Sequence, residues 1–191
     1  MELLQEYIRK NGKAVNEHVL KVDSFLNHQV DPMLMEKIGE EFYRYFKKYP
    51  ITKVLTVETS GIAPALFCAL KFNVPMVFIK KNVPSTMNDF YTAEVHSFTK
   101  NKTYTICLSK EYINENDHIL FIDDFLANGQ AFLGVEKIIK EAKASLEGVG
   151  MVIEKSFQEG HTLIENKGYD IYSLARIASL GENEIWFVGE K

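Results

Sequence analysis

The most informative hydrophobic pattern of the chain lies in residues 118–131, which read HILFIDDFLANGQA. Residues 119–122 are all apolar, as in a strand that is covered on both faces of a parallel sheet. After a short turn, apolar residues recur at helical spacing and predict one buried helix face. These helical positions are Ala131, Val135, Ile138, Ile139 and Ala142. The segment therefore predicts a strand that ends before Asp123, a turn over 127–131 and a helix.

The rest of the chain alternates between strand-like and helix-like patterns. Apolar runs predict further strands at 53–57, 74–79, 146–153, 169–177 and 184–188. Helical spacing predicts a first helix that Asn11-Gly12 ends, and a second that Asp31-Pro32 begins. A third is expected after residue 61. Strands that alternate with helices imply right-handed crossovers and a mostly parallel sheet, which is an α/β fold.

Two stretches have no clean period. Residues 19–31 mix apolar and polar positions like a ligand-lining loop or a short edge strand. Residues 82–93 are predicted to form a mobile loop, followed by strands 94–98 and 103–108 that pair as a hairpin. A loop beside such a hairpin is a plausible lid over a site. No repeat or linker interrupts the sequence, so we expect one domain over residues 1–191.

Composition narrows the class of protein. The charged fraction of 25% and the hydrophobic fraction of 46% are ordinary for a soluble globular chain. The net charge of −4 offers no basic field for nucleic acid or an anionic membrane. The cysteines, Cys68 and Cys107, have no metal-binding spacing and are expected to be buried thiols of a reducing compartment. Without a signal peptide or a membrane-spanning run, we expect a cytoplasmic protein.

Candidate chemistry begins with the adjacent carboxylates of Asp123 and Asp124. Free backbone N–H groups and the helix dipole make the turn that follows them a place for an anion such as phosphate. The carboxylates accept hydrogen bonds or bind a cation, and vicinal sugar hydroxyls are good donors to such a pair. Together they indicate a site for a ribose 5-phosphate. An Asp-Asp pair at a strand end also occurs in metal-dependent phosphotransferases and in solvated turns.

Other polar residues follow strands at the same predicted edge of the sheet, where ligands of open α/β folds bind. Ser60 and Gly61 precede a helix, as a second anion cradle or as an ordinary helix start. Lys80 and Lys81 either neutralise a departing diphosphate or sit in solvent. The Lys155 ammonium either donates to an oxo group of a purine or extends to solvent.

Residues 118–131 resemble the phosphoribosyl diphosphate signature of the type I phosphoribosyltransferases. The strings VLKVDSFLNHQVD, ETSGIAPA, HSFTK, FIDDFLANGQA and VIEKSFQEG, in this order, are similar to those of bacterial xanthine phosphoribosyltransferases over essentially the whole chain. The resemblance implies a mostly parallel sheet flanked by helices and a flexible lid loop. It also implies a small hood formed by about residues 1–30 and 155–191.

The resemblance also implies roles for single residues. Asp123 and Asp124 would hold the ribose hydroxyls, and Ser60, Gly61 and the lysines would hold the diphosphate. Phosphoribosyl diphosphate would be bound by Ala127, Asn128, Gly129, Gln130 and Ala131. Xanthine would be bound by Leu20, Asn27 and Lys155.

Xanthine carries acceptors at both oxo groups, so donors such as the Asn27 amide and the Lys155 ammonium suit it. Many relatives have Thr-Gly-Gly-Thr where this chain has residues 128–131, which shifts phosphate binding toward backbone N–H groups. Mg²⁺ is expected to enter with the diphosphate, with no metal site built from side chains alone. The family also implies a homodimer.

The implied reaction is attack of the 9-nitrogen of xanthine on C1 of the ribose, with loss of diphosphate, in purine salvage. One alternative keeps the reaction and changes the base to guanine, hypoxanthine or adenine. Another is a purine regulator that binds phosphoribosyl diphosphate without transfer, although this chain lacks the length and the basic face for a DNA-binding domain. A third is a haloacid-type phosphatase with Asp123 as nucleophile, which the order of motifs does not favour.

Overall fold

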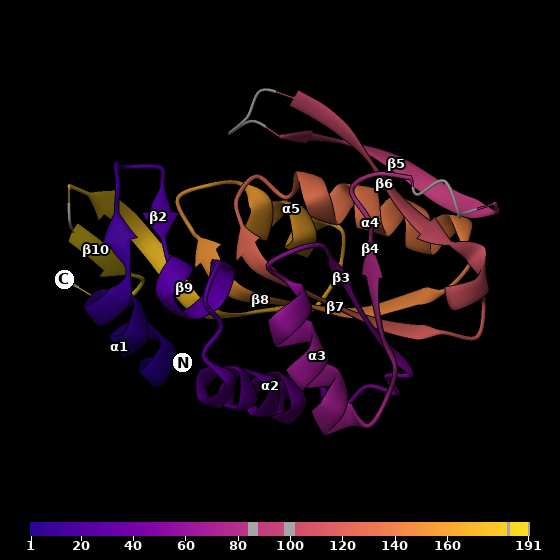
Figure 1. The fold of residues 1–191 in the computed structure, drawn as a ribbon, viewed down its shortest axis with the longest axis horizontal. Coiled ribbons are helices and arrows are strands. Elements are labelled where there is room, and N and C mark those ends of the chain that lie inside the picture. Colours follow the sequence, from indigo (N-terminus) through magenta and orange to yellow (C-terminus); the bar gives the residue numbers. More distant parts are fainter. Residues whose placement is uncertain (84–87, 98–101, 183, 191) are drawn as a thin grey trace.

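The computed structural model describes residues 1–83, 88–97, 102–182 and 184–190. Its centre is a six-stranded sheet in the order β10-β9-β8-β7-β3-β4 (Figure 1). These strands are β3 (Lys53–Val57), β4 (Met76–Ile79), β7 (His118–Leu126), β8 (Ser145–Lys155), β9 (Ile171–Gly181) and β10 (Glu184–Phe187). All neighbours pair in parallel except β10, which is antiparallel to β9. The predicted α/β fold with a mostly parallel sheet is confirmed.

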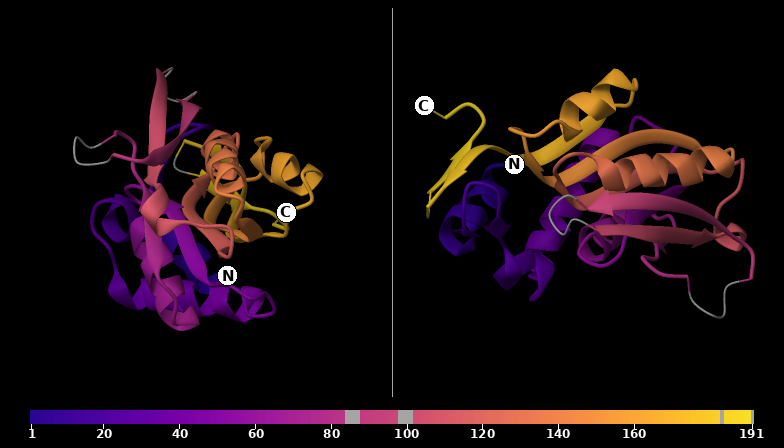
Figure 2. Two further views of the ribbon diagram at one scale, coloured as in Figure 1. Left: turned by 90° about the vertical axis from the view of Figure 1, so that its right-hand side faces the viewer. Right: turned by 90° about the horizontal axis from the view of Figure 1, so that it is seen from above.

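Helices cover both faces of this sheet (Figures 1 and 2). They are α1 (Glu2–Asn11), α2 (Pro32–Phe46), α3 (Ile62–Phe72), α4 (Gln130–Glu141) and α5 (Gly160–Asn166). The start of α2 is as predicted, because the Asp31 side chain accepts hydrogen bonds from the backbone N–H groups of Met33 and Leu34. None of the helices in the described ranges is long and apolar enough to cross a membrane.

The alternation of side chains along β7 divides the core into two layers. Leu120 and Ile122 belong to the layer that contains the buried face of α2 and α3. Ile119 and Phe121 belong to the layer that contains α4 and the inner side of a hairpin. A strand buried on both faces explains why the apolar run at 119–122 is unbroken.

The hairpin consists of β5 (Phe90–Ser97) and β6 (Lys102–Ser109), which pair antiparallel. It packs on α4, where a Cβ on Gly134 would stand 2.7 Å from Val95 Cγ2. The predicted hairpin is confirmed, but the loop prediction for 82–93 is wrong at its end. Residues 90–93 extend β5, because their backbone pairs with the far end of β6. Residues 84–87 and Phe98 lie outside the described residues, so the lid itself stays a prediction.

The two ends of the chain meet at one side of the sheet, as Figure 1 shows on its left. There α1, β1 (Lys13–Ala14), β2 (Leu20–Lys21) and a π-helical turn (Asp23–Asn27) lie beside β9 and β10. Arg9 forms an ion pair with Glu190 and lies over the Phe187 ring. We call these segments the hood. Residues 19–31 thus form a short strand and a turn, and the assignment of the whole chain to a single domain stays a prediction.

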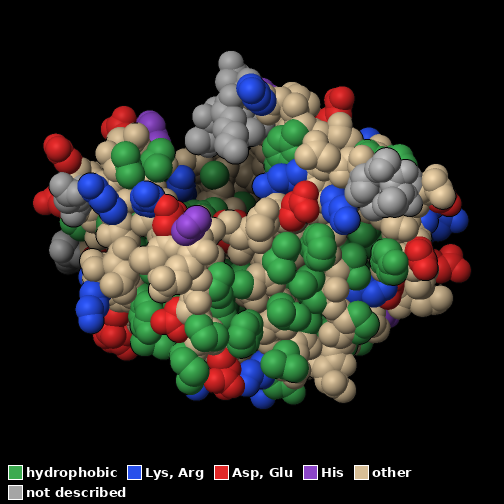
Figure 3. Space-filling view, viewed as in Figure 1, with side chains coloured by type: hydrophobic (Ala, Val, Ile, Leu, Met, Phe, Trp, Pro, Cys, Tyr) green, Lys and Arg blue, Asp and Glu red, His purple; other side chains and the backbone are tan. Residues whose placement is uncertain are grey.

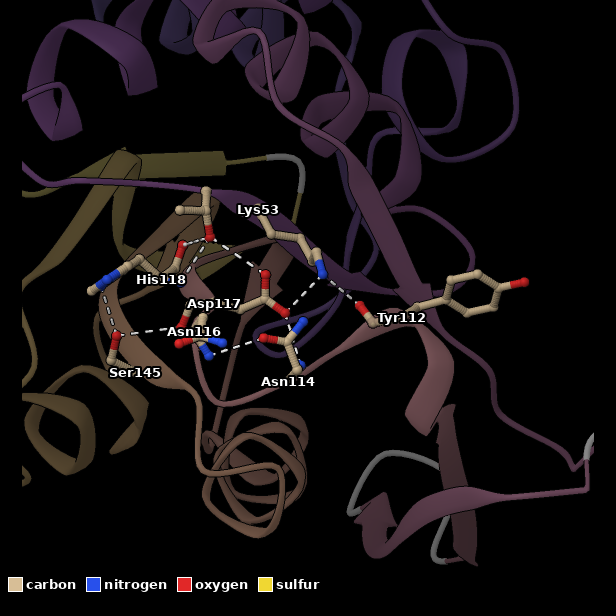
Figure 4. Close-up of polar contacts among 8 residues, drawn as sticks. Lys53, Tyr112, Asn114, Asn116, Asp117, His118 and Ser145 are labelled. Atoms are coloured by element: carbon tan, nitrogen blue, oxygen red, sulfur yellow. Dashed lines mark hydrogen bonds and ion pairs between the residues drawn. The ribbon is translucent and has the colours of Figure 1, made fainter.

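A polar cluster closes the amino ends of the central strands (Figure 4). Lys53 Nζ donates to Asp117 Oδ2 at 2.8 Å and to the Tyr112 carbonyl at 2.7 Å. The same Asp117 oxygen accepts from the Asn114 backbone N–H at 2.8 Å. We call these residues the amino-end cluster. It lies at the edge of the sheet opposite to the predicted site.

Candidate functional site

The acidic pair lies within β7 rather than after it. Asp123 is in register with Met151 of β8, and the ladder continues to Leu126. The prediction that the strand ends before the pair is therefore wrong. The apolar residues Phe125 and Leu126 extend the strand beyond the pair, and a hydrogen bond links the two carboxyl side chains. Asp123 is 7% exposed and Asp124 is half-buried.

The surroundings of the pair favour the protonated forms of both carboxyls. Burial raises the pKa of Asp123 well above its usual range, and the charge of Asp124 raises it further. Burial also raises the pKa of Asp124. Lys81 opposes both shifts through its charge, without an ion-pair contact to either carboxylate among the described residues. Hydroxyl donors or positive charge from a ligand would stabilise the ionised carboxylates and bring these pKa values down again.

The loop between β7 and α4 has the geometry of an anion cradle. Gly129 caps α4 with a φ of 78°, a left-handed conformation that favours glycine. The Gly160 N–H donates to the Ala127 carbonyl at 3.0 Å, and a Cβ on Gly160 would overlap that oxygen. The start of α5 therefore braces the loop. The free N–H groups of the loop and the dipole of α4 supply the anion-binding character that was predicted.

The turn after β3 lies against Asp123. A Cβ on Gly61 would overlap both Thr56 Oγ1 and Asp123 Oδ1, so only glycine fits there. The Thr56 hydroxyl is fully buried and has no hydrogen-bond partner among the described residues. The Glu58–Thr59 peptide bond is cis. Ser60 is half-buried, and neither Ser60 nor Gly61 lines the cavity of about 670 Å³ to which Asp123 belongs.

The two lysines after β4 point to different places. Lys81 lies over the Tyr104 ring at 5.8 Å, and its charge acts on both members of the acidic pair. Lys80 exchanges backbone hydrogen bonds with Cys107 of β6, and its side chain lines a separate hollow of about 870 Å³. Of the two lysines, Lys81 is therefore the one whose charge acts on the acidic pair.

Lys155 ends β8 beneath the hood. Its Nζ donates to the His18 carbonyl at 2.7 Å and lies 5.6 Å from the centre of the Phe125 ring. Burial lowers the pKa of Lys155. The ammonium is thus held at the junction of sheet and hood, with an aromatic face beside it.

A cavity of about 670 Å³ unites most of these groups. Figure 3 shows the molecule hollowed between the hood and the hairpin. The cavity is lined by Asp123, by all five residues of the predicted phosphate loop and by Lys155. Its size is typical of a small-molecule site. Val19 belongs to the stretch 19–31 that was predicted to resemble a ligand-lining loop, whereas several other lining residues were not predicted, among them Asn16, His18, Tyr104, Phe125 and Gln158.

The structure does not bring Leu20 and Asn27 to the wall of this cavity. Leu20 is 6% exposed and its side chain belongs to the core of the hood. Asn27 ends the π-helical turn and is exposed. Their neighbours His18 and Val19 line the cavity instead. The one signal for this loop in the sequence is Asn16, whose side chain accepts from the N–H groups of His18 and Val19 and forms a turn.

Comparisons with known proteins agree with this arrangement. The chain is 57% identical over 189 residues to xanthine phosphoribosyltransferase 1 of Clostridium botulinum (strain Hall), covering 98% of this chain and 100% of that protein. It is 55% identical over 191 residues to xanthine phosphoribosyltransferase of Latilactobacillus sakei, covering 100% of this chain and 98% of that protein. No protein-family model matches the chain.

A solved structure supports the fold. Adenine phosphoribosyltransferase from Rhodothermus marinus superposes with a TM-score of 0.76 at 18% identity, covering 92% of this chain and 99% of that chain. At this identity the likeness concerns the architecture alone. The curated relatives extend over the full chain at more than half identity, so the chain belongs to the xanthine phosphoribosyltransferase family, within the type I phosphoribosyltransferases.

Proposed function

We propose that this protein transfers the 5-phosphoribosyl group from phosphoribosyl diphosphate to N9 of xanthine, giving xanthosine 5′-monophosphate and diphosphate. It is an enzyme of purine salvage. The observation that carries the proposal is the full-length identity with xanthine phosphoribosyltransferases. The cavity supports it, because Asp123 of the acidic pair, the anion cradle and the half-buried Lys155 line it together.

In the proposed reaction the phosphate of the substrate lies in the loop 127–131. Asp123 and Asp124 accept hydrogen bonds from the ribose hydroxyls and hold C1 of the ribose toward the base. The transition state has oxocarbenium character, as in other glycosyl transfers, so no covalent nucleophile is needed. Catalysis then rests on alignment of the two substrates and on stabilisation of the departing diphosphate. Lys81 is the lysine proposed to supply positive charge there, since its charge acts on both members of the acidic pair.

The base is proposed to lie between the hood and the end of β8. Lys155 donates to an oxo group of xanthine in place of its present acceptor, the His18 carbonyl. Phe125 and Phe157 line this part of the cavity and offer aromatic faces for a flat base. Because Lys155 can donate but not accept, it suits the oxo groups of xanthine. Leu20 and Asn27 remain proposed contacts of the base through the same hood segment.

Mg²⁺ is proposed to enter with the diphosphate. Magnesium is usually held by one or two carboxylates together with substrate phosphates. The residues present fit that pattern, since Asp123 lines the cavity beside the anion cradle and the adjacent Asp124 offers a second hard oxygen ligand. When bound, the ion would supply positive charge to the diphosphate.

A homodimer is the proposed assembly. Hydrophobic side chains gather over α2, α3 and β4 on one face of the molecule (Figure 3). Met33, Leu66 and Leu70 are 66%, 52% and 69% exposed. A contiguous apolar face of this kind is typical of a protein interface. Leu70→Glu is expected to give monomers in sedimentation experiments in which the wild type sediments as a dimer.

We place the reaction in the cytoplasm, where the free thiols of Cys68 and Cys107 stay reduced.

The test of the reaction is ultraviolet detection of nucleotide formed from phosphoribosyl diphosphate, Mg²⁺ and each of xanthine, guanine, hypoxanthine and adenine. Preferred turnover of xanthine is the expected result. Preferred turnover of another base would keep the reaction and contradict the assigned substrate. Binding of phosphoribosyl diphosphate without turnover of any base would indicate a regulatory protein instead.

A further inference from the structure

Glu154 of β8 is a fully buried carboxylate at the junction of sheet, hood and α5. Each of its oxygens accepts two hydrogen bonds. Oε1 accepts from Ser156 Oγ at 2.5 Å and from Arg176 Nε at 2.9 Å. Oε2 accepts from Ser173 Oγ at 2.5 Å and from His161 Nδ1 at 2.7 Å. A buried carboxylate with four donors fixes the segments that supply those donors.

On one side, the Glu154 carboxylate anchors the end of β8, which carries Lys155, the proposed donor to xanthine. Lys155 is the next residue of the strand, so its side chain projects to the opposite face. Ser156 anchors the residue after Lys155, and Ser173 and Arg176 anchor the neighbouring strand β9. The charge of Glu154 is not among the causes of the lowered Lys155 pKa. The structural connection from Glu154 to Lys155 runs through the backbone of β8 and the hydrogen bond from Ser156.

On the other side, the Glu154 carboxylate anchors the start of α5, which contacts the phosphate loop 127–131. His161 lies in the first turn of α5, directly after Gly160. Gly160 donates to the Ala127 carbonyl and lies against Gly129. The hydrogen bond from His161 to Glu154 thus connects the end of β8 to the loop. The base side and the phosphate side of the cavity share this one anchor.

We propose that Glu154 is a positioning residue that fixes the base side of the cavity relative to the phosphate side. This inference rests on the proposed function, because alignment of two substrates matters only where they react with each other. A misplacement of reacting groups by about 1 Å lowers a rate about a hundredfold. Loss of the anchor should therefore lower kcat more than it weakens the binding of either substrate alone.

The test compares Glu154→Gln with the wild type and with Glu136→Gln. Glu136 is a matched control, since it is 5% exposed, accepts hydrogen bonds from Lys140, Lys167 and Tyr169, and lies within α4, away from the cavity wall. For Glu154→Gln we expect kcat to fall about thirtyfold while the dissociation constant of each substrate alone changes less than about threefold. For Glu136→Gln we expect thermal stability to fall and kcat to stay within about twofold of wild type.

A second pair of variants decides the matter if Glu154→Gln does not fold. His161→Leu removes the donor toward the phosphate side and should lower kcat about tenfold, whereas His161→Gln keeps a donor and should restore most of it. An unchanged kcat in Glu154→Gln, or an equal fall in Glu136→Gln, would overturn the inference. Equal activity of the two His161 variants would do the same. Absence of turnover in the wild type would instead contradict the proposed function.

Discussion

The two edges of the central sheet treat their buried acids in opposite ways. In the amino-end cluster, Asp117 has a buried lysine partner and a backbone donor, and its side chain is 11% exposed (Figure 4). At the carboxyl edge, Asp123 is as deeply buried, but among the described residues its surroundings are the hydrogen-bonded acid Asp124, the charge of Lys81 and the Thr56 hydroxyl, which has no hydrogen-bond partner there. At the amino edge, the polar groups of the cluster find their hydrogen-bond partners within the chain.

At the carboxyl edge, Asp123 and Thr56 are left to be satisfied by a ligand. Uncompensated groups cost stability, and proteins retain them where function requires them. The comparison indicates that substitutions at the two edges should separate stability from activity. Removal of a carboxylate from the amino-end cluster should destabilise the fold and spare turnover. Removal of one from the carboxyl edge should abolish turnover and spare the fold.

After Asp123→Asn, which is expected to abolish turnover, the largest effect is expected for Asp124→Asn. An amide in place of the carboxylate loses the charge-assisted hydrogen bonds to the ribose hydroxyls, and kcat/KM for phosphoribosyl diphosphate should fall about a thousandfold. Steady-state kinetics at saturating xanthine measure this. Unchanged kinetics would remove Asp124 from the site.

Asp117→Asn should give the next largest effect, on stability. It leaves the Lys53 ammonium buried without its carboxylate, and removal of one partner of a buried ion pair costs about 3 kcal/mol. Urea unfolding measures the change, and kcat at a temperature where the variant is folded should match the wild type. A variant that unfolds like the wild type would show that the amino-end cluster contributes little.

Glu136→Gln is expected to change the stability of the fold in a way that depends on pH. Burial by itself raises the pKa of Glu136, but hydrogen bonds from Lys140, Lys167 and Tyr169 outweigh it and the pKa is lowered. A lowered folded-state pKa gives stability that is present above the ordinary range of a glutamate and is lost as the pH falls through the folded-state value. At neutral pH the variant should be less stable by about 2 kcal/mol. Urea unfolding from neutral pH to acid should show this gap closing, and a constant gap would contradict the assignment.

The smallest effect on activity is expected for the two adjacent lysines, Lys80 and Lys81, which should differ from each other. Lys81→Ala should lower kcat/KM for phosphoribosyl diphosphate about tenfold, because its charge acts at the acidic pair. Lys80→Ala is the matched control and should change it less than about twofold, since the Lys80 side chain lines the other hollow. Equal effects of the two substitutions would place both side chains at the diphosphate.

Much of the fold follows from local pattern. The apolar run at 119–122 predicts β7, and the Asp31-Pro32 pair predicts the start of α2. The end of β7 could not be predicted, because two adjacent acids are typical of a loop. Only pairing with β8 and the apolar residues after the pair keep that stretch extended. The start of β5 was missed because residues 90–93 have no clean local period, and pairing with the end of β6 is what keeps them extended.

The site was predicted where its residues follow one another along the chain, as in 127–131. It was not predictable where tertiary packing decides the direction of a side chain. The sequence cannot distinguish Lys80 from Lys81, but the backbone bridge from Lys80 to Cys107 does. Similarly, the packing of Leu20 in the core leaves His18 and Val19 to line the cavity.

The most direct test of the contrast between the two edges is the free energy of unfolding of Asp123→Asn at neutral pH, measured beside its turnover. The folded-state pKa of Asp123 is raised by burial and by Asp124, so ionisation lowers stability as the pH rises through that range. Removal of this charge should give a variant that is more stable than the wild type and has no measurable turnover. A variant that is less stable than the wild type would contradict the account.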